Sequence, residues 1–147
     1  MINIKVEGIN EIKKSMSQNK KELLIKADKG VTRASLLLLR DIKESIAGRK
    51  SEPKSVDTGR FLNSITFRKL APLQAKVFSN AEYASILEYG TSPHYIAPKR
   101  KKALHWDDLF SKGHDVKGIK PRRHFRNSVI RITPKVTETI ALEMKSI

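Results

Sequence analysis

The chain lacks cysteine altogether and is poor in acidic and aromatic side chains: its 147 residues include 15 Asp or Glu and 6% Phe, Trp or Tyr. Without cysteine it can form no disulfide framework, no thiolate zinc site and no cysteine nucleophile. The first six residues alternate polar and apolar side chains instead of forming an apolar run. We therefore expect neither an export signal nor a membrane anchor.

Positive charge is in excess: 30 Lys or Arg give a net charge of +15 at pH 7. Residues 93–126 alone hold ten Lys or Arg and three Asp or Glu. This predicts a salt-dependent attraction to a polyanion without identifying it. Two basic runs could neutralise phosphates or meet an acidic protein, with a solvated surface as the alternative. They comprise Lys99, Arg100, Lys101 and Lys102, then Lys120, Arg122 and Arg123.

The N-terminal third has the pattern of a short strand followed by a long helix. Alternation over residues 2–7 predicts the strand, and apolar spacing over residues 9–47 predicts the helix, with a break near residues 17–19. Four consecutive leucines, residues 36–39, place apolar groups all round the helix axis. We expect this turn either to be deeply buried or to contact another subunit as well as its own core.

The middle of the chain reads as a loop, a hairpin and a short helix. Residues 48–57 lack apolar periodicity, which predicts a flexible basic loop. Two β-like runs, residues 64–70 and 73–79, are joined at Ala71-Pro72 and predict a hairpin. Its expected buried positions are Ile65, Phe67, Val77 and Phe78. A short helix over residues 81–89 should end at Gly90.

The last third is expected to be an irregular arm and a helix. Residues 91–121 are rich in Pro, Gly, Lys and His, with short strands expected at 103–106 and near 116–119. Apolar spacing over residues 122–147 predicts a helix with a kink or restart at Pro134. We interpret residues 1–147 as a single domain.

Nothing in the residue pattern favours catalysis, a metal or a cofactor. The four histidines are spaced 11, 9 and 10 residues apart, which matches no metal-ligand motif. Asp107-Asp108 could act as a general base or bind a cation, but a solvated turn or helix cap is favoured. No glycine-rich phosphate loop is present. We therefore expect no catalytic residue, no bound metal and no cofactor.

Three segments together are more specific: residues 56–65 (VDTGRFLNSI), residues 80–91 (NAEYASILEYGT) and residues 120–128 (KPRRHFRNS). In this order and spacing they resemble the tail-completion (neck, head-to-tail joining) proteins of long-tailed bacteriophages. His124 and Ser128 depart from the pattern, standing where that family more usually has Pro and Ala. The resemblance marks as assembly residues Asp57, Thr58, Gly59, Arg60, Tyr83, Glu88, Gly90, Thr91, Pro121 and Phe125.

The resemblance implies an α+β subunit with a small twisted, mainly antiparallel sheet packed against a long N-terminal helix and a C-terminal helix. Such subunits form a ring, commonly of six, at the tail top or head–tail junction, in contact with tail-tube and connector proteins. The implied protein is structural, not an enzyme, and belongs to the virion after assembly in the host cytoplasm. The arm would meet the next ring or an adjacent subunit.

We expect specific contacts for two of these side chains. Asp57 can cap the turn that Thr58 and Gly59 begin, and Glu88 can pair with an arginine such as Arg60 or Arg123. The basic surface would face genomic DNA or acidic ring partners. The alternative function is a small basic protein that binds nucleic acid without sequence preference, and it depends on the charge alone.

Overall fold

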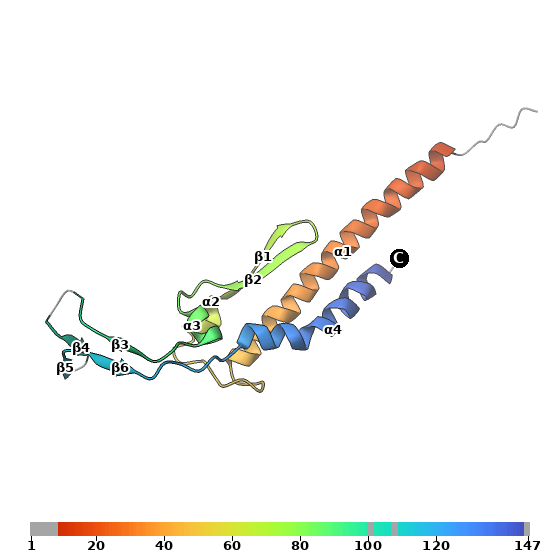
Figure 1. Cartoon of the computed structure of the whole chain (residues 1–147). Helices are drawn as coiled ribbons and strands as arrows, with labels where there is room; N and C mark the ends of the chain where they lie inside the picture. Colours follow the sequence, from red (N-terminus) through yellow and green to blue (C-terminus); the bar gives the residue numbers. More distant parts are fainter. Residues whose placement is uncertain (1–8, 100–101, 107–108, 146–147) are drawn as a thin grey trace, which may run out of the picture.

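The computed structural model describes residues 9–99, 102–106 and 109–145. It shows an elongated α+β fold with a long first helix, a last helix beside it, and a slender arm at one end (Figure 1). The helices are α1 Ile9–Ile46, α2 Arg60–Ser64, α3 Ala84–Tyr89 and α4 His124–Lys145. The strands are β1 Ile65–Ala71, β2 Gln74–Ser79, β3 His94–Ile96, β4 Leu104–Trp106, β5 Leu109–Ser111 and β6 His114–Val116.

Helix α1 is one unbroken helix of 38 residues, so the break expected near residues 17–19 is wrong. Ser17, Gln18 and Asn19 are weaker helix formers than alanine, but each costs only a few tenths of a kcal/mol, and neither Gly nor Pro interrupts the segment. The strand expected at residues 2–7 lies outside the described residues. Within the described part of the chain, no helix combines the length and the apolar character that crossing a bilayer requires.

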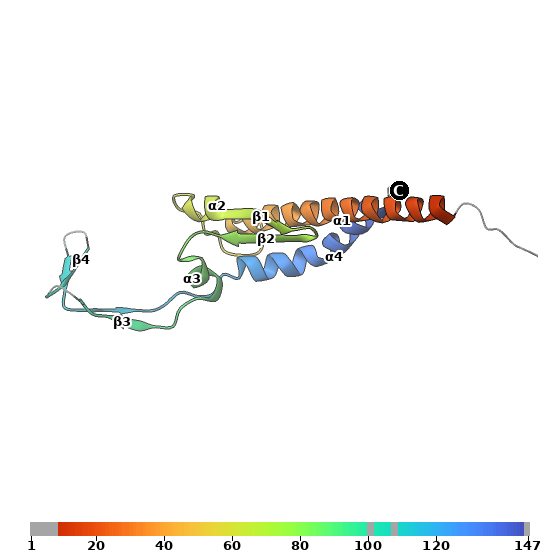
Figure 2. The same ribbon diagram turned by 90° about the horizontal axis from the view of Figure 1, so that it is seen from above.

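Helix α4 runs antiparallel along the C-terminal part of α1 (Figures 1 and 2). The two helices come close at Gly30, where an added Cβ would lie 3.1 Å from the Cα of Ile140. Pro134 lies inside α4, which is a single helix from His124 to Lys145, so the helix does not restart there. The absence of a side chain at Gly30 lets the two backbones approach.

The expected hairpin is confirmed: β1 pairs with β2 in antiparallel register, with Ile65 opposite Ser79 and Phe67 opposite Val77. Ile65 and Val77 belong to the core beneath the hairpin. Phe67 and Phe78, also expected to be buried, are each only half-buried and lie outside the core cluster. Phe78 is on the other face of the hairpin. It pairs with Thr66 on the opposite face and lies beneath the side chains of Arg68 and Lys76, 5.5 and 5.0 Å from its ring centroid. Neighbouring strand residues point to opposite faces, so Val77 and Phe78 cannot share one.

The apolar core is small and lies where the end of α1 meets α2 and β1. It consists of Ile42, Ile46, Phe61 and Ile65, each at most 5% exposed. Leu38 and Leu39 pack against it, whereas Leu36 and Leu37 are 45% and 37% exposed. The four-leucine turn is therefore not deeply buried within the described residues.

The arm consists of two small antiparallel pairs that stand clear of the helical body (Figures 1 and 2). Strand β3 pairs with β6, and β4 pairs with β5 nearer the tip. The strand expected at residues 103–106 is confirmed as β4. The one expected near residues 116–119 lies earlier, since β6 overlaps that range only at Val116. At the base, Thr91 forms an isolated antiparallel bridge with Ile119.

A buried polar cluster joins α1, the loop after it and α4. The Arg131 side chain donates to Asp41 Oδ2 at 2.8 and 3.1 Å and to Glu52 Oε1 at 2.6 Å. Burial alone would raise the pKa of Glu52, but hydrogen bonds from Arg131, Ser45 and Asn127 outweigh it and lower the pKa to about 2. Glu52 thus fastens the 48–57 loop, expected to be flexible, to both helices.

His124 continues this cluster and is fully buried. Its Nδ1 lies 2.8 Å from Ser45 Oγ, its Nε2 lies 2.6 Å from Ser55 Oγ, and Ser45 Oγ donates to Glu52 Oε2 at 2.8 Å. Because Ser45 gives its only proton to Glu52, it accepts from Nδ1–H of the histidine. Burial, which lowers the pKa of His124, favours the neutral imidazole, whose Nε2 can accept from Ser55.

This arrangement predicts a loss of stability in mild acid. Burial lowers the pKa of His124, although the Glu88 and Glu52 carboxylates oppose the shift. The unfolded chain therefore takes up a proton near the ordinary value of 6.5, while the folded chain resists it until lower pH. The free energy of unfolding should be unaffected by this group above pH 6.5 and should fall as the pH drops below it. Glu52 adds a second loss as the pH falls from 4.5 towards 2.

Denaturant unfolding between pH 8 and pH 5 measures the first loss. His124→Gln should have a lower free energy of unfolding at pH 8 and a smaller decline towards pH 5 than the wild type. His94→Gln, on the exposed arm, is the control and should keep the wild-type decline. Equal declines in the wild type and His124→Gln would contradict the neutral buried imidazole.

Candidate assembly site at the base of the arm

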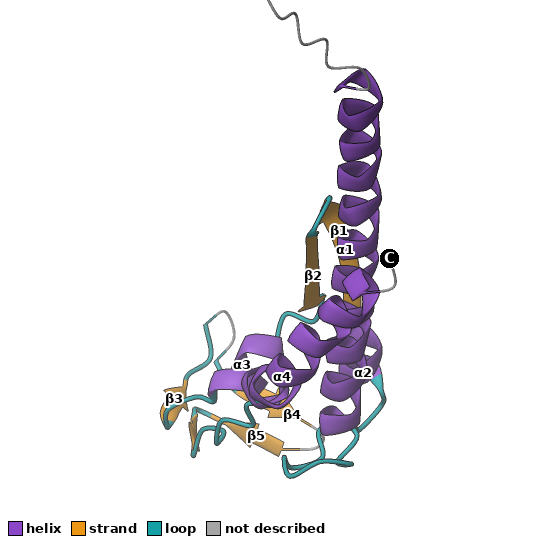
Figure 3. Ribbon diagram, turned by 90° about the vertical axis from the view of Figure 1, so that its right-hand side faces the viewer, coloured by secondary structure: helices purple, strands orange, loops and turns teal. Residues whose placement is uncertain are grey.

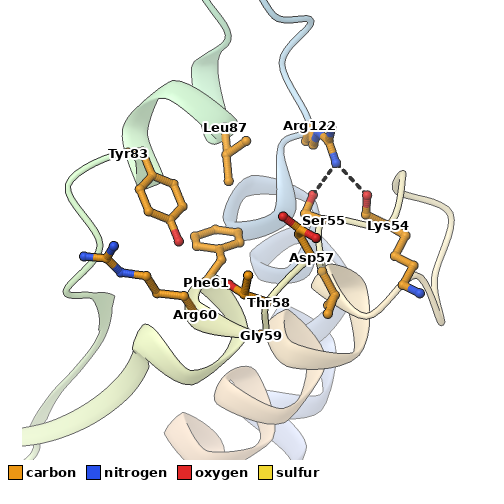
Figure 4. Close-up of a pocket in the computed structure, with 11 residues that line it drawn as sticks. Lys54, Ser55, Asp57, Thr58, Gly59, Arg60, Phe61, Tyr83, Leu87 and Arg122 are labelled. Atoms are coloured by element: carbon orange, nitrogen blue, oxygen red, sulfur yellow. Dashed lines mark hydrogen bonds between the residues drawn. The ribbon is translucent and has the colours of Figure 1, made fainter. Parts of the chain in front are cut away.

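The three motif segments come together in a pocket of about 380 Å³ beside the base of the arm (Figure 4). The loop before α2, the start of α3 and the segment before α4 each contribute. Five expected assembly residues line it, together with Arg122 from the basic runs. The lining residues are Lys54, Ser55, Val56, Asp57, Thr58, Gly59, Arg60, Phe61, Tyr83, Leu87 and Arg122.

Phe61 connects this pocket to the buried polar cluster. Its ring lies 6.0 Å from the ring of Tyr83 on one side and 6.1 Å from that of His124 on another, centroid to centroid. The side chain is 5% exposed, and Figure 4 shows it beneath Tyr83 and Leu87. Any group that entered the pocket would contact a wall supported by the core, not a mobile loop.

The pocket has an excess of positive charge: Lys54, Arg60 and Arg122 line it with only Asp57 as counter-charge. Arg122 is held in place, since its Nη1 donates to the Lys54 carbonyl at 2.5 Å and to Ser55 Oγ at 2.8 Å. The Arg60 side chain projects away from Arg122 (Figure 4). The expected cap by Asp57 is absent: Gly59, with φ +78°, precedes α2 without a side-chain cap.

Glu88 has different partners from those expected. Its carboxylate is buried and accepts hydrogen bonds from the backbone N–H groups of Phe125 (3.0 Å) and Arg126 (2.8 Å). Within the described residues, no ion pair joins Glu88 to Arg60 or Arg123. The first N–H groups of a helix lack intrahelical partners and carry partial positive charge. Glu88 is therefore the N-terminal cap of α4, supplied by α3.

Two glycines fix the direction in which the arm leaves the body. Gly90 has φ +75°, and a Cβ there would lie 2.4 Å from the Ile119 carbonyl oxygen and 2.9 Å from the Pro121 nitrogen. Gly118 has φ +78°, and a Cβ there would lie 2.2 Å from the Thr91 carbonyl oxygen. Thr91 and Ile119 exchange backbone hydrogen bonds of 2.9 and 3.2 Å between them. The motif residues Gly90, Thr91 and Pro121 thus lie where the two chain segments at the base of the arm are in close backbone contact.

The described members of the two basic runs lie at different places along the arm. Lys99 and Lys102 are exposed on the arm, whereas Lys120 and Arg123 are exposed at its base. Arg100, Lys101, Asp107 and Asp108 lie outside the described residues. Among the residues that the structure describes, no three His, Asp or Glu side chains cluster closely enough to hold a metal ion.

Gly90→Ala should destabilise the base of the arm more than Gly59→Ala does. Both glycines have nearly the same φ, but a Cβ at Gly59 would lie 3.7 Å from its nearest neighbour, the side-chain nitrogen of Asn63. Gly90, with ψ −177°, also occupies a region that is essentially restricted to glycine. We expect a cost of about 1 kcal/mol for Gly59→Ala and at least about 3 kcal/mol for Gly90→Ala. Denaturant unfolding measures both costs, and equal costs would contradict the close backbone contact at Gly90.

Removing the Glu88 cap should destabilise the fold, and reversing a second charge should not restore the lost stability. We expect Glu88→Ala to lower the free energy of unfolding by about 2 kcal/mol, since two half-buried N–H groups at the start of α4 lose their acceptor. Glu82→Ala, an exposed acid six residues earlier, should change it by less than about 0.5 kcal/mol. Because the partners are backbone groups, Arg123→Glu should not rescue Glu88→Arg. Rescue by that second reversal would instead indicate a side-chain ion pair.

Residues 9–90, more than half of the chain, match a family described as "Bacteriophage HK97-gp10, putative tail-component". The matched range includes α1, the core, the Asp57–Arg60 turn and α3, and it ends at the base of the arm. No curated protein sequence and no solved structure matches the chain. With the expected α+β fold also confirmed, the chain belongs to the HK97-gp10-like family of bacteriophage tail components.

Proposed function

We propose that the chain is the subunit of a ring, commonly of six copies, that completes the phage tail and joins it to the head connector. The observation that carries this proposal is the amount of exposed surface. The chain exposes 11825 Å², whereas a compact monomer of 16.7 kDa exposes about 7,600 Å². A subunit of this shape is suited to burying the surplus against neighbouring molecules.

The exposed apolar side chains support the same proposal. They include Leu36 and Leu37 on α1, Tyr89 on α3 and Ile130 on α4. On the arm, Tyr95 and Phe110 are 59% and 74% exposed. They lie on several sides of the subunit, as expected of a protein that contacts copies of itself, tail-tube proteins and connector proteins at once.

The charges support an anionic partner for the arm. Most described carboxylates in the body are engaged in ion pairs with the chain's own cations, among them Asp28, Asp41, Glu44 and Glu52. The arm carries Lys99, Lys102, Lys112, Lys117 and Lys120, for which no ion pair is found among the described residues. We propose that these lysines, with Arg122 and Arg123 at the base, face genomic DNA or acidic surfaces of neighbouring tail proteins.

The mass of the assembled particle tests this function. Light scattering of the purified chain, alone and with tail-tube or connector proteins, should detect a ring of roughly 100 kDa, six times 16.7 kDa. The chain should also be present in purified virions and should bind DNA only weakly. A chain that is monomeric with every partner and absent from virions would overturn the proposal.

The net charge favours a second candidate, a free protein that binds nucleic acid without sequence preference. A salt titration of DNA binding distinguishes the two. Tight binding that weakens steeply with salt, by a chain that stays monomeric, would support this candidate against the ring.

A further inference from the structure

The exposed face of α3 combines a free acid with apolar side chains. Glu82 lies in the turn that leads into α3, and Ile86 and Tyr89 follow at helical spacing. Ile86 is 39% exposed and Tyr89 is 80% exposed, the highest value among the large apolar side chains of the described chain. Tyr83 and Leu87 point inward to the core instead. Glu82 has no ion pair within the described residues.

A groove of about 510 Å³ on α1 and α2 has the complementary composition. Leu36, Leu39 and Leu62 line it, and Lys43 and Arg49 also contribute. Neither cation has an ion pair within the described residues, whereas the neighbouring Arg40 is held by Glu44 at 2.8 Å. The groove thus offers apolar contact beside unneutralised positive charge.

The two surfaces lie on opposite sides of the body. Figures 2 and 3 agree in placing α2 on one side and α3 on the other, with the core between them. The α3 face therefore cannot reach the groove of its own chain. Complementary patches on opposite sides of a subunit meet head to tail between copies, and such a contact forms a ring when the rotation closes.

We infer that the α3 face of one copy docks in the α1–α2 groove of the next, with Tyr89 entering between Leu36 and Leu62 and Glu82 meeting Lys43 and Arg49. This inference rests on the proposed ring and names its subunit contact. Charge complementarity supports a second copy as the occupant: the free acid of one copy meets the free cations of the other, which offsets part of the repulsion between chains of net charge +15. It also explains why Leu36, in the four-leucine turn, is exposed in the single chain.

Disulfide cross-linking tests the contact directly, because the chain has no cysteine of its own. Tyr89→Cys and Leu36→Cys, mixed under oxidising conditions, should give a disulfide-linked dimer that neither variant gives alone. A chain with both substitutions should give a ladder that ends at the size of the ring. Tyr95→Cys mixed with Leu36→Cys is the control, since Tyr95 is also exposed but lies on the arm, and it should not cross-link.

Charge reversal tests the same contact by a second readout. Glu82→Lys, or Lys43→Glu with Arg49→Glu, should weaken self-association at least about 10-fold in sedimentation experiments. Combining all three substitutions in one chain should restore most of the affinity. Asp115→Lys, at an exposed acid of the arm, should leave it unchanged. The far-UV circular dichroism spectrum should be unaltered throughout, because Glu82 and Arg49 are exposed, Lys43 is half-buried and none of the three belongs to the core.

The outcomes separate this contact from the ring itself. Wild-type rings without cross-linking at positions 36 and 89 would overturn the contact and leave the proposed function standing. Failure of the triple reversal to restore association would also overturn it. A wild-type chain that stays monomeric at several hundred micromolar, alone and with tail proteins, would overturn both.

Discussion

The bridge that Arg131 forms between Asp41 and Glu52 is the constraint on which the rest of the body depends. The two carboxylates lie on α1 and on the following loop, their side chains are 8% and 2% exposed, and the guanidinium from α4 is their shared partner. Loss of one member of such a group leaves an uncompensated buried charge and typically costs about 3–5 kcal/mol. Only six apolar side chains are buried in the described chain, so this polar cluster is as central to the packing as the core. It holds the loop in place, and the loop forms one wall of the pocket at the base of the arm.

Much of the fold could be predicted from local pattern. Apolar spacing located α1 and α4, alternation located the β1–β2 hairpin, and Gly90 marked the end of α3. The errors concern partners that a local pattern does not contain. Glu88 was expected to meet an arginine, but its partners are backbone N–H groups 37 and 38 residues away. The sequence shows which side chains can donate a hydrogen bond. It does not show which helix N-terminus a given carboxylate will contact. Phe78 is a different case, since strict alternation with Val77 already places it on the outer face.

The motif residues lie close together in the structure, but their contacts differ from those expected. Asp57, Thr58, Gly59, Arg60 and Tyr83 do line one pocket, and Gly90, Thr91 and Pro121 meet beside it. The polar cluster beneath was not predicted. In the sequence, Glu52 is only an acid in a basic loop and Arg131 is only an arginine on an expected helix. The two are 79 residues apart. Such a distance carries no signal in a single sequence, because any of the chain's 30 Lys or Arg was an equal candidate partner.

The antiparallel pairing of the first and last helices has a consequence for the order of events in the cell. Asp41 and Ser45 leave the ribosome early, but Arg131 and His124 follow them by 90 and 79 residues. Until those residues emerge, the end of α1 carries a carboxylate without its guanidinium, and α3 has no helix to cap. An incomplete chain therefore lacks the contacts that hold the 48–57 loop and the last helix to α1. The body can close only after residue 131 has emerged, so folding waits for nearly the whole polypeptide.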